Sequence, residues 1–313
     1  MEPVLEVREI TKIFRQHGQS DFTAVDKVSF SLYSGETLGI VGESGSGKTT
    51  TVGMIIRLLE ATNGQIYLNG KDITRIKGRE LRDAYRDLQM VFQSPTGSFD
   101  PRRTLGDGIG ESLRNRGLSR QATEARVATL LKQCGLPADY AKRYPHEVSG
   151  GQCQRAAIAR ALAIQPKILI CDEATSSLDV TIQEQIITLL QTLQKEQGMS
   201  YLFICHNLAL VQSFCDRVIV MYKGSIMESG ATARVIEEPR HPYTKMLLSC
   251  ILDDSLKRED NVPNLPEDLA DFNDHNNGCK FYLACPVCKD ICKSIQPAMI
   301  QRDGCEVACH LYA

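Results

Sequence analysis

The sequence predicts an α/β fold built around short, buried, parallel strands. Several short apolar runs are rich in β-branched side chains and stop at a glycine or a polar residue, as buried strands do. One of these runs, TLGIV at 37–41, leads into the glycine-rich turn GESGSGKTT at 42–50, and a helical pattern follows. Strand, glycine-rich loop and helix in this order are the context of a phosphate-binding loop. The length of 313 residues is enough for one large domain with an appendage or for two modest domains.

The N-terminal part is predicted to contribute strands on either side of this loop. The stretch 3–14, PVLEVREITKIF, alternates apolar and polar residues like a strand with one buried face. KVSFSLY at 27–33 predicts a second strand, and a Ser-Gly turn at 34–35 joins it to the apolar run before the loop. After the helix, GQIYLNGKDI at 64–73 predicts a strand with an Asn-Gly turn.

The remaining elements follow in an alternating order. Residues 100–165 are mostly helical in pattern. PKILICDE at 166–173 is a short apolar run that ends in two acids, and SYLFICHN at 200–207 ends in a histidine. DRVIVMYKGSIMESG at 216–230 predicts two strands joined by a Lys-Gly turn. The polar, acidic stretch 252–278 is rich in Pro and Asn and predicts a linker, and the sequence shows no internal repeat.

Composition narrows the class of protein. The formal net charge of −2 gives no indication of binding to nucleic acid or to an anionic membrane. No window reaches the roughly 18 consecutive apolar residues that a membrane-spanning helix needs. The N-terminal residues contain no basic segment followed by an apolar one, so they do not read as a signal peptide. We therefore expect the chain to stay in the cytosol.

The 12 cysteines fall into two groups. Six are scattered through apolar or mixed segments and are expected to be small buried side chains, namely Cys134, Cys153, Cys171, Cys205, Cys215 and Cys250. The other six crowd into residues 279–309, namely Cys279, Cys285, Cys288, Cys292, Cys305 and Cys309. In a reducing compartment such a cluster more often binds metal than forms disulfides.

The loop at 42–50 fits the pattern G-x-x-x-x-G-K-[ST]. Its glycines let the backbone curl so that several N–H groups point at a β-phosphate, and the helix that follows presents its positive end. Lys48 is expected to reach the β- and γ-oxygens, and the Thr49 hydroxyl is expected to ligate Mg²⁺. A chance glycine-rich turn is the alternative, which the register of strand, glycines, Lys-Thr and helix disfavours. The expected ATP-binding residues of the loop are Gly42, Glu43, Ser44, Gly45, Ser46, Gly47, Lys48, Thr49 and Thr50.

Two acids at the end of the run 168–173 are the expected partners of the loop. Asp172 can hold the Mg²⁺, directly or through water, and Glu173 is placed to act as the general base toward the attacking water. Without the phosphate loop, two adjacent acids after a strand would be a solvated strand end as often as a catalytic pair. Adenine needs a flat apolar contact, for which Phe14 is the candidate, although an ordinary core or rim phenylalanine is nearly as plausible.

Five motifs occur in a fixed order, and together they resemble the ATPase subunits of ABC transporters over residues 1–250. The motifs are the phosphate loop, VFQSP at 91–95, VSGGQCQR at 148–155, ILICDEATSSLD at 168–179 and ICHN at 204–207. The resemblance implies a P-loop NTPase fold with a RecA-like core, an antiparallel β subdomain and a helical subdomain at about 94–165. It implies that residues 251–313 form a linker and a small Cys-rich C-terminal extension. Val148 and the stretch EATSSLD depart slightly from the family pattern, at no catalytic atom.

The second glycine stretch, at 149–152, opens a predicted helix. Ser149 can cap that helix, Gly150 and Gly151 allow close backbone approach, and a helix N-terminus attracts anions. In the resembled family this signature, here ending in Gln152, closes over the γ-phosphate held by a partner subunit in a head-to-tail dimer. Since the loop at 42–50 already cradles one triphosphate, a second anion-binding helix start fits the nucleotide of a partner.

The resemblance implies roles for three further residues. Gln93 would contact Mg²⁺ and the attacking water, and would report nucleotide occupancy to the helical subdomain, which docks on a membrane-spanning partner. His206 would hold the γ-phosphate and position the water for Glu173. Asp179 would lie at the interface between the two ATPase subunits.

The C-terminal region narrows the resemblance to the importers of oligopeptides, dipeptides and nickel. The residues that carry it are RHPYTKMLLSCI at 240–251 and the cysteine pattern after 278. Some members hold a [4Fe–4S] cluster, so the resemblance implies the same possibility here, with Cys279, Cys285, Cys292 and Cys309 as ligands. Four thiolates also suit zinc. Cys288 and Cys305 are extra and open an alternative ligand set, and free thiols or a purely structural knot without metal are the third reading.

The leading hypothesis is therefore an ATP-hydrolysing subunit of a membrane importer for peptides. ATP binding would close the dimer, hydrolysis would reopen it, and the motion would alternate the access of a separate channel. The expected partners are a second ATPase subunit, identical or related, two integral membrane permease subunits and an extracellular or periplasmic substrate-binding protein, with no nucleic acid. The chain would lie at the cytoplasmic face of the cell membrane. Import of nickel or a metal chelate is the alternative within this class, and a soluble ABC-type ATPase without a channel is the alternative outside it.

Overall fold

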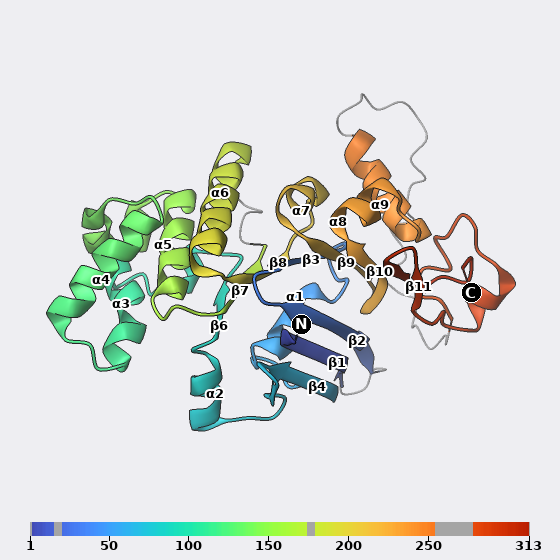
Figure 1. Cartoon of the computed structure of the whole chain (residues 1–313), viewed down its shortest axis with the longest axis horizontal. Coiled ribbons are helices and arrows are strands. Elements are labelled where there is room, and N and C mark those ends of the chain that lie inside the picture. The colour runs from blue at the N-terminus through green and yellow to red at the C-terminus, as the bar shows by residue number, and fades with distance from the viewer. Residues whose placement is uncertain (1, 16–20, 174–178, 254–277, 313) are drawn as a thin grey trace.

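The computed structural model of the chain describes residues 2–15, 21–173, 179–253 and 278–312 (Figure 1). Its centre is an eight-stranded sheet with the order β11-β12-β10-β9-β3-β8-β7-β6. Five neighbouring strands, β9, β3, β8, β7 and β6, run parallel to one another. On the other side of β9 the pairs β9–β10, β10–β12 and β12–β11 are antiparallel. The strands of this sheet are β3 (Thr37–Val41), β6 (Leu88–Val91), β7 (Ile168–Asp172), β8 (Ser200–Ile204), β9 (Arg217–Tyr222), β10 (Ser225–Ala231), β11 (Ile300–Arg302) and β12 (Cys305–Val307).

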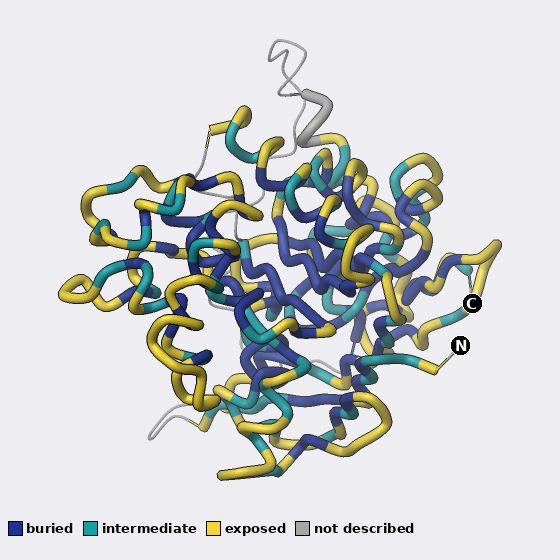
Figure 2. The backbone as a smooth tube through the Cα atoms, turned by 60° about the vertical axis from the view of Figure 1, so that its left-hand side comes forward, coloured by how far each residue is buried: buried dark blue, intermediate teal, exposed yellow. Residues whose placement is uncertain are grey.

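The two faces of the main sheet pack against different layers, because successive side chains of a strand point to opposite faces. In β7, Ile168 and Ile170 belong to the core that includes α1 and the smaller sheet, while Leu169 and Cys171 belong to the core that includes α5 and α6. Both faces are therefore covered, which explains the uninterrupted apolar runs in the sequence, and the buried strands form the centre of the molecule in Figure 2. The helices around this sheet are α1 (Lys48–Ile55), α5 (Gly150–Leu162), α6 (Val180–Gln197), α7 (Leu208–Phe214), α8 (Thr232–Glu237) and α9 (Pro242–Asp253).

A smaller antiparallel sheet, with the order β2-β1-β4-β5, covers one face of the main sheet (Figure 1). The predicted Asn-Gly turn joins β4 to β5, and Asn69 and Gly70 both have positive φ, as such hairpin turns require. The second strand begins earlier than predicted, because Phe22 pairs with Phe14 at the end of the first strand. The strands of this sheet are β1 (Pro3–Phe14), β2 (Phe22–Tyr33), β4 (Asn63–Leu68) and β5 (Lys71–Asp72).

The helical region predicted at 100–165 is confirmed as a group of packed helices at the left of Figure 1. Thr104 and Ser119 cap the first two of these helices by accepting a hydrogen bond from a backbone N–H within the first turn. None of the described helices is both long and apolar enough to cross a membrane. The elements of this region and the helix before it are α2 (Gly78–Ala84), η1 (Thr96–Ser98), α3 (Leu105–Asn115), α4 (Arg120–Gln133), η2 (Ala138–Lys142) and η3 (Pro145–Glu147), followed by α5.

The C-terminal segment joins the main sheet. Helix α9 runs through the boundary expected at residue 250, and most of the expected linker, residues 254–277, lies outside the described residues. After a short 3₁₀ turn, η5 (Asp290–Lys293), strand β12 pairs with β10 and strand β11 pairs with β12. Phe281 and Val307 are fully buried, so this segment contributes side chains to the core.

The cysteines of the first group behave as expected. The scattered members within the described side chains are all buried, namely Cys134, Cys153, Cys171, Cys205 and Cys215. The side chain of Cys250 lies outside the described part of the chain.

Candidate active site

The phosphate loop is held tightly by the strands around it. Gly42 and Gly47 have φ values of 151° and 98°, which side chains other than glycine rarely adopt. A Cβ on Gly42 would lie 2.2 Å from the carbonyl oxygen of Met221, and one on Gly47 would lie 2.6 Å from that of Ala24. These two glycines are therefore required both for the curl of the loop and for its packing against β9 and β2.

The turn between β9 and β10 also fixes the loop, a feature that the sequence motifs do not reveal. Gly224 N–H donates to the carbonyl oxygen of Ser46 at 3.0 Å, and Asp26 N–H donates to the carbonyl oxygen of Gly224 at 2.8 Å. Lys223 and Gly224 both have positive φ, as the predicted Lys-Gly turn requires. The predicted hairpin thus closes against the phosphate loop.

Lys48 is buried at the start of α1 and points back into the loop. Its Nζ donates to the carbonyl oxygens of Gly42 and Glu43, each at 2.7 Å, and to the Ser46 hydroxyl at 3.3 Å. Burial lowers the pKa of Lys48, while the negative charges of the nearby acids act in the opposite direction. The ammonium group is therefore held by neutral oxygen acceptors, which negatively charged phosphate oxygens can replace. Thr49 and Thr50 follow in the first turn of the helix, with Thr49 exposed.

Asp172, at the end of β7, is a buried carboxylate. Its Oδ1 atom has no hydrogen-bond partner within the described part of the chain. Burial, together with the charge of Glu173, raises the pKa of Asp172 to about 6, and Lys48 opposes this shift. A buried and incompletely satisfied carboxylate oxygen beside a phosphate loop fits the coordination of Mg²⁺.

Glu173 and Gln93 lie in direct contact, although 80 residues separate them in the chain. Gln93 Nε2 donates to Glu173 Oε2 at 2.7 Å. They meet because β6 and β7 are parallel neighbours, so the residues after Val91 and Asp172 emerge at the same edge of the sheet. Glu173 has a φ of 44° and its N–H donates to the carbonyl oxygen of Ile204, which fixes the turn that presents its side chain. The structure thus brings together two of the three expected catalytic residues.

His206 emerges at the same edge, from the neighbouring strand. Asp172 pairs with Ile204 in the parallel register of β7 and β8, and His206 follows two residues later with an exposed side chain. The next residue, Asn207, caps α7 by accepting hydrogen bonds from the N–H groups of Ala209 and Leu210. The histidine is therefore placed at a fixed turn between strand and helix.

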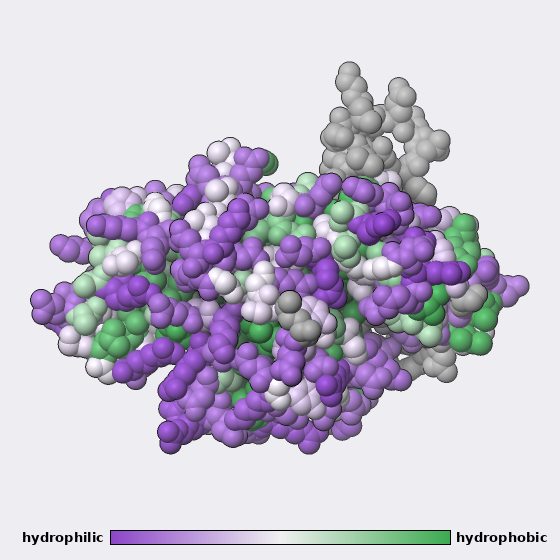
Figure 3. Space-filling view, in the orientation of Figure 1, coloured by the Kyte–Doolittle hydropathy of each residue, from purple (hydrophilic) through white to green (hydrophobic). Residues whose placement is uncertain are grey.

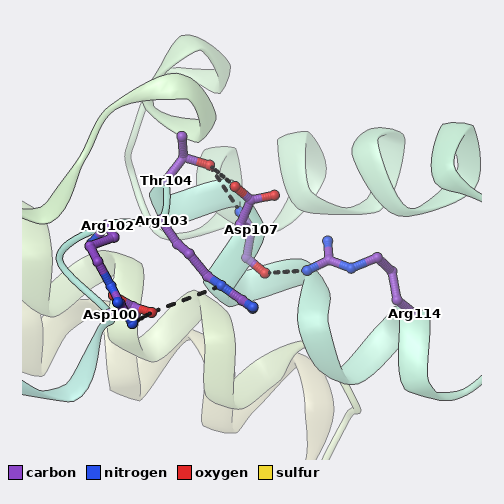
Figure 4. A network of polar contacts seen from close by, with 6 residues as sticks. All are labelled: Asp100, Arg102, Arg103, Thr104, Asp107 and Arg114. Atoms are coloured by element: carbon purple, nitrogen blue, oxygen red, sulfur yellow. Dashed lines mark hydrogen bonds and ion pairs between the residues drawn. The ribbon is translucent and has the colours of Figure 1, made fainter.

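The segment after Gln93 is tied to α5, the helix that begins with the Ser-Gly-Gly stretch. Arg160 of α5 donates to the carbonyl oxygen and hydroxyl of Ser98, and its guanidinium lies over the ring of Phe99 at 4.4 Å. The next residues form the polar network drawn in Figure 4, in which Asp100 and Asp107 organise the chain into the start of α3 through Arg102, Arg103, Thr104 and Arg114. The segment that follows Gln93 is thus fixed to α5 through Ser98 and Phe99 before the chain enters α3.

Ser149 caps α5 as predicted. Its hydroxyl accepts from Gln152 N–H at 3.3 Å, and Gln152 Oε1 accepts from Ser149 N–H at 2.9 Å, which is a capping box. Ser149 and Gly150 are exposed, so this helix start is accessible. Gly151 is buried, and a Cβ there would lie 2.7 Å from Cγ2 of Ile182. Gly151 is thus needed for the approach of α5 to α6, in addition to the role expected from the motif.

Asp179 opens α6 beside this helix. Its Oδ1 accepts from Ile182 N–H at 2.9 Å, which makes it the N-cap of α6, and its side chain is exposed. Residues 174–178, between Glu173 and this cap, lie outside the described residues. The exposed starts of α5 and α6 thus lie together, joined by the contact between Gly151 and Ile182.

Phe14 is half-buried at the end of β1, opposite Phe22. Lys12 Nζ lies 5.1 Å from the centre of its ring. This position at the rim of the small sheet is compatible with both readings of the residue, the adenine contact and the ordinary rim side chain.

The structure does not support the possible metal centre at the tail cysteines. Cys279, Cys285, Cys292 and Cys309 line one cavity of about 10 Å³, together with buried His241. Burial raises the pKa of Cys279 to about 11, so without a bound metal this thiol is protonated near neutral pH. Throughout the described ranges, no group of three or more His, Cys, Asp or Glu side chains is arranged to hold a metal ion. The expected [4Fe–4S] or zinc site is therefore not supported, and the described tail cysteines are free thiols.

The outer face of the tail is apolar. Figure 3 shows apolar side chains gathered at the right-hand end of the molecule, where the C-terminal segment lies. Large apolar side chains between 39% and 53% exposed occur throughout this segment, namely Leu283, Val287, Ile291, Ile295, Met299 and Leu311.

The comparisons with known proteins agree with this geometry. Residues 25–176 match the family described as "ABC transporter", and residues 227–292 match "Oligopeptide/dipeptide transporter, C-terminal region". The chain is 46% identical over 280 residues to the oligopeptide transport ATP-binding protein OppF of Salmonella typhimurium, covering 88% of this chain and 84% of that protein. It is 44% identical over 325 residues to the oligopeptide transport ATP-binding protein AppF of Bacillus subtilis, covering 100% of this chain and 98% of that protein.

A solved structure is similar as well. The dimeric ATP-binding cassette MJ0796, in a post-hydrolysis state bound to ADP and Pi, matches with a TM-score of 0.67 and 29% identity, covering 73% of this chain and 98% of that chain. The chain therefore belongs to the ATP-binding subunits of ABC transporters, in the group whose members carry the oligopeptide/dipeptide transporter C-terminal region.

Proposed function

We propose that this chain hydrolyses ATP in order to energise the import of oligopeptides or dipeptides through a membrane transporter. The single observation that carries the chemistry is the edge of the main sheet where Lys48, Asp172 and the pair formed by Gln93 and Glu173 converge. The named function of the relatives, oligopeptide transport, supports the choice of substrate class. A relative named as a glutathione import ATP-binding protein is 49% identical over 257 residues, which are 41% of its length, and glutathione is a small peptide.

The proposed mechanism uses the described residues in sequence. The backbone N–H groups of the loop at 42–50 bind the phosphates, and Lys48 exchanges its carbonyl acceptors for β- and γ-oxygens. Mg²⁺, when bound, would neutralise charge on the phosphates, and Thr49, Asp172 and Gln93 are the residues that would hold it.

Two residues act on the attacking water in this proposal. Glu173 accepts its proton, and its carboxylate is oriented by the hydrogen bond from Gln93. His206 lies at the end of the adjacent strand, where it would hold the γ-phosphate and fix the position of that water. The Phe14 ring would stack on adenine at the rim of the small sheet.

The second half of each site would come from another subunit. The exposed start of α5, with Ser149, Gly150, Gly151 and Gln152, would close over the γ-phosphate bound by the partner, and Asp179 would lie beside it at the interface. The similar cassette MJ0796 was solved as a dimer, which supports this arrangement. The partner would be an identical or a related ATPase subunit.

The proposed assembly also contains two integral membrane permease subunits and an extracellular or periplasmic substrate-binding protein, and this chain would bind at the cytoplasmic face of the membrane. Residues 1–250 would form the ATPase domain, with the helical subdomain at about 94–165 docked on the permease, and residues 251–313 would form the C-terminal extension. Peptide selectivity would belong to the other chains. We assign no step of the reaction to the tail cysteines.

The test is uptake of a labelled peptide by vesicles that contain the whole transporter with Glu173→Gln in this chain. We expect uptake and ATP hydrolysis to fall by at least about a hundredfold, because general-base catalysis contributes that much, while ATP binding persists. Glu184→Gln, the same change on the exposed face of α6, is the matched control and should retain wild-type rates. Wild-type hydrolysis by Glu173→Gln would remove this residue as the base, and hydrolysis without peptide uptake by the wild-type complex would overturn the peptide assignment.

A further inference from the structure

One contact joins the phosphate loop to the C-terminal region. Glu43 N–H donates a hydrogen bond to the hydroxyl oxygen of Tyr243 at 3.1 Å, across 200 residues of sequence. Tyr243 lies in the first turn of α9 and is fully buried. None of the five nucleotide motifs includes this residue, and the mechanism above does not use it.

The N–H that contacts Tyr243 belongs to a peptide group whose carbonyl oxygen accepts a hydrogen bond from Lys48. The carbonyl oxygen of Gly42 and the N–H of Glu43 belong to the same peptide bond, and Lys48 Nζ donates to that carbonyl at 2.7 Å. Tyr243 therefore fixes the direction of this peptide group, with its carbonyl toward Lys48 and its N–H away from it. Gly42 has no side chain that could restrict the rotation of this peptide group, so contacts with other residues must hold it.

The ring of Tyr243 is held in turn by the Cys-rich segment. Its centre lies 4.6 Å from that of Tyr222 and 5.4 Å from that of Phe281, and the rings of Tyr222 and Phe281 meet edge to face at 5.4 Å. Phe281 is fully buried and lies between the first two cysteines of the tail. The start of α9 is also anchored, because buried Glu228 accepts hydrogen bonds from the N–H groups of Arg240 and His241 at 2.9 Å each.

We propose that Tyr243 is a positioning residue for the phosphate loop, and that the packing of the C-terminal segment on its ring sets the orientation of the Gly42–Glu43 peptide. This inference deepens the proposed function and rests on it, since it concerns the same ATP site. When Lys48 leaves the Gly42 carbonyl for phosphate oxygens, the hydrogen bond from Glu43 to Tyr243 remains and keeps the loop in its binding conformation. The C-terminal extension is in this way a structural part of the nucleotide site.

The test compares Tyr243→Phe with Tyr312→Phe in the full-length chain. Each change removes one hydroxyl from the C-terminal region, but Tyr312 donates to the carbonyl oxygen of Arg240 and not to the loop. We expect Tyr243→Phe to weaken ATP binding about fivefold, the loss of one hydrogen bond, with a similar rise in KM and little change in kcat. Amide exchange of the peptide that contains Glu43 should become faster in this variant alone.

A second variant tests the link to the tail. Phe281→Leu should weaken ATP binding in the same direction, by about twofold to fivefold, because it removes the ring contact with Tyr243. Leu283→Ala, at a tail residue that is 48% exposed, is its control.

The possible results distinguish a failure of the positioning role of Tyr243 from a failure of the proposed ATPase function. Unchanged ATP affinity and unchanged Glu43 exchange in Tyr243→Phe would overturn the positioning role, and unchanged affinity in Phe281→Leu would overturn the link to the tail. If the wild-type chain itself bound no ATP, the proposed function would fail instead. An equal loss of affinity in Tyr243→Phe and Tyr312→Phe would also count against the positioning role, since only one of them contacts the loop.

Discussion

Replacing Gly151 with alanine should force apart the first turns of α5 and α6. The added Cβ would lie 2.7 Å from Cγ2 of Ile182, well inside the distance that two carbon atoms tolerate, and 3.8 Å from two further atoms of the same side chain. Gly151 is buried and Ile182 is packed against the core, so neither residue can move into solvent without disturbing its neighbours.

The size of the effect follows from this single close contact. Forcing one extra methyl group into a packed interior costs about 1–3 kcal/mol of the free energy of unfolding. Shortening Ile182 to alanine removes Cγ2 and opens the space for the new methyl group. We therefore expect Gly151→Ala alone to be destabilising by about 2 kcal/mol, and the double variant Gly151→Ala/Ile182→Ala to be at least about 1 kcal/mol more stable than the sum of the single changes predicts.

Chemical denaturation of the four proteins in this double-mutant cycle measures the coupling energy. ATP hydrolysis by the proposed dimer measures the functional effect, since Ser149 and Asp179 open the two helices that the methyl group separates. Hydrolysis should fall in Gly151→Ala and recover in part in the double variant. If the changes in the free energy of unfolding are strictly additive, the contact with Ile182 is not the reason for the glycine. The proposed approach of the backbone to an anion would then be the remaining reason.

Two other changes probe the nucleotide interface and the packing of the tail. Ser149→Arg should block hydrolysis in the proposed dimer. ATP binding by the phosphate loop of the same chain, measured by equilibrium titration, should be unchanged. Normal hydrolysis would argue against a site that two subunits share. His241 is 1% exposed, and burial lowers its pKa from 6.5 to about 4, so between these pH values the unfolded chain binds more protons than the folded one. The free energy of unfolding should therefore fall by about 3 kcal/mol as the pH drops from 6.5 to 4, and this fall should be smaller in His241→Gln. Denaturant titrations at several pH values measure it. The same dependence on pH in both proteins would show that protonation of His241 is not its cause.

Much of the candidate site at the edge of the main sheet could be predicted from the sequence, because its residues follow the ends of strands. A run of buried residues that stops at a charged residue marks the point where a strand leaves the sheet, and parallel strands leave at the same edge. The positions of Asp172, Glu173 and His206 follow from this rule, and the hydrogen bond between Gln93 and Glu173 agrees with it. The roles of these residues toward ATP remain predictions.

The contacts that hold the site from behind could not be predicted. The approach of the Lys223–Gly224 turn to Ser46, and of Tyr243 to Glu43, depends on how distant segments pack, and no local pattern of residues marks such contacts. The second reason for a glycine at position 151 could not be predicted either. The motif predicts a glycine there because the backbone must approach an anion, and the structure shows that a larger residue would also collide with the side chain of Ile182. The cysteine spacing predicts a possible ligand set, but within the described residues no group of side chains is arranged to hold a metal ion, so this prediction is not supported.

The short strands β12 and β11 have a consequence for the integrity of the sheet. Without them, the backbone N–H and C=O groups of β10 from Glu228 to Gly230 would form an unprotected edge, open to strand addition by another chain. The edge that replaces it, β11, has only three residues and carries Arg302, which makes it a poor template for intermolecular pairing. Removal of the last residues of the chain is therefore expected to promote self-association during expression, independently of any effect on nucleotide binding.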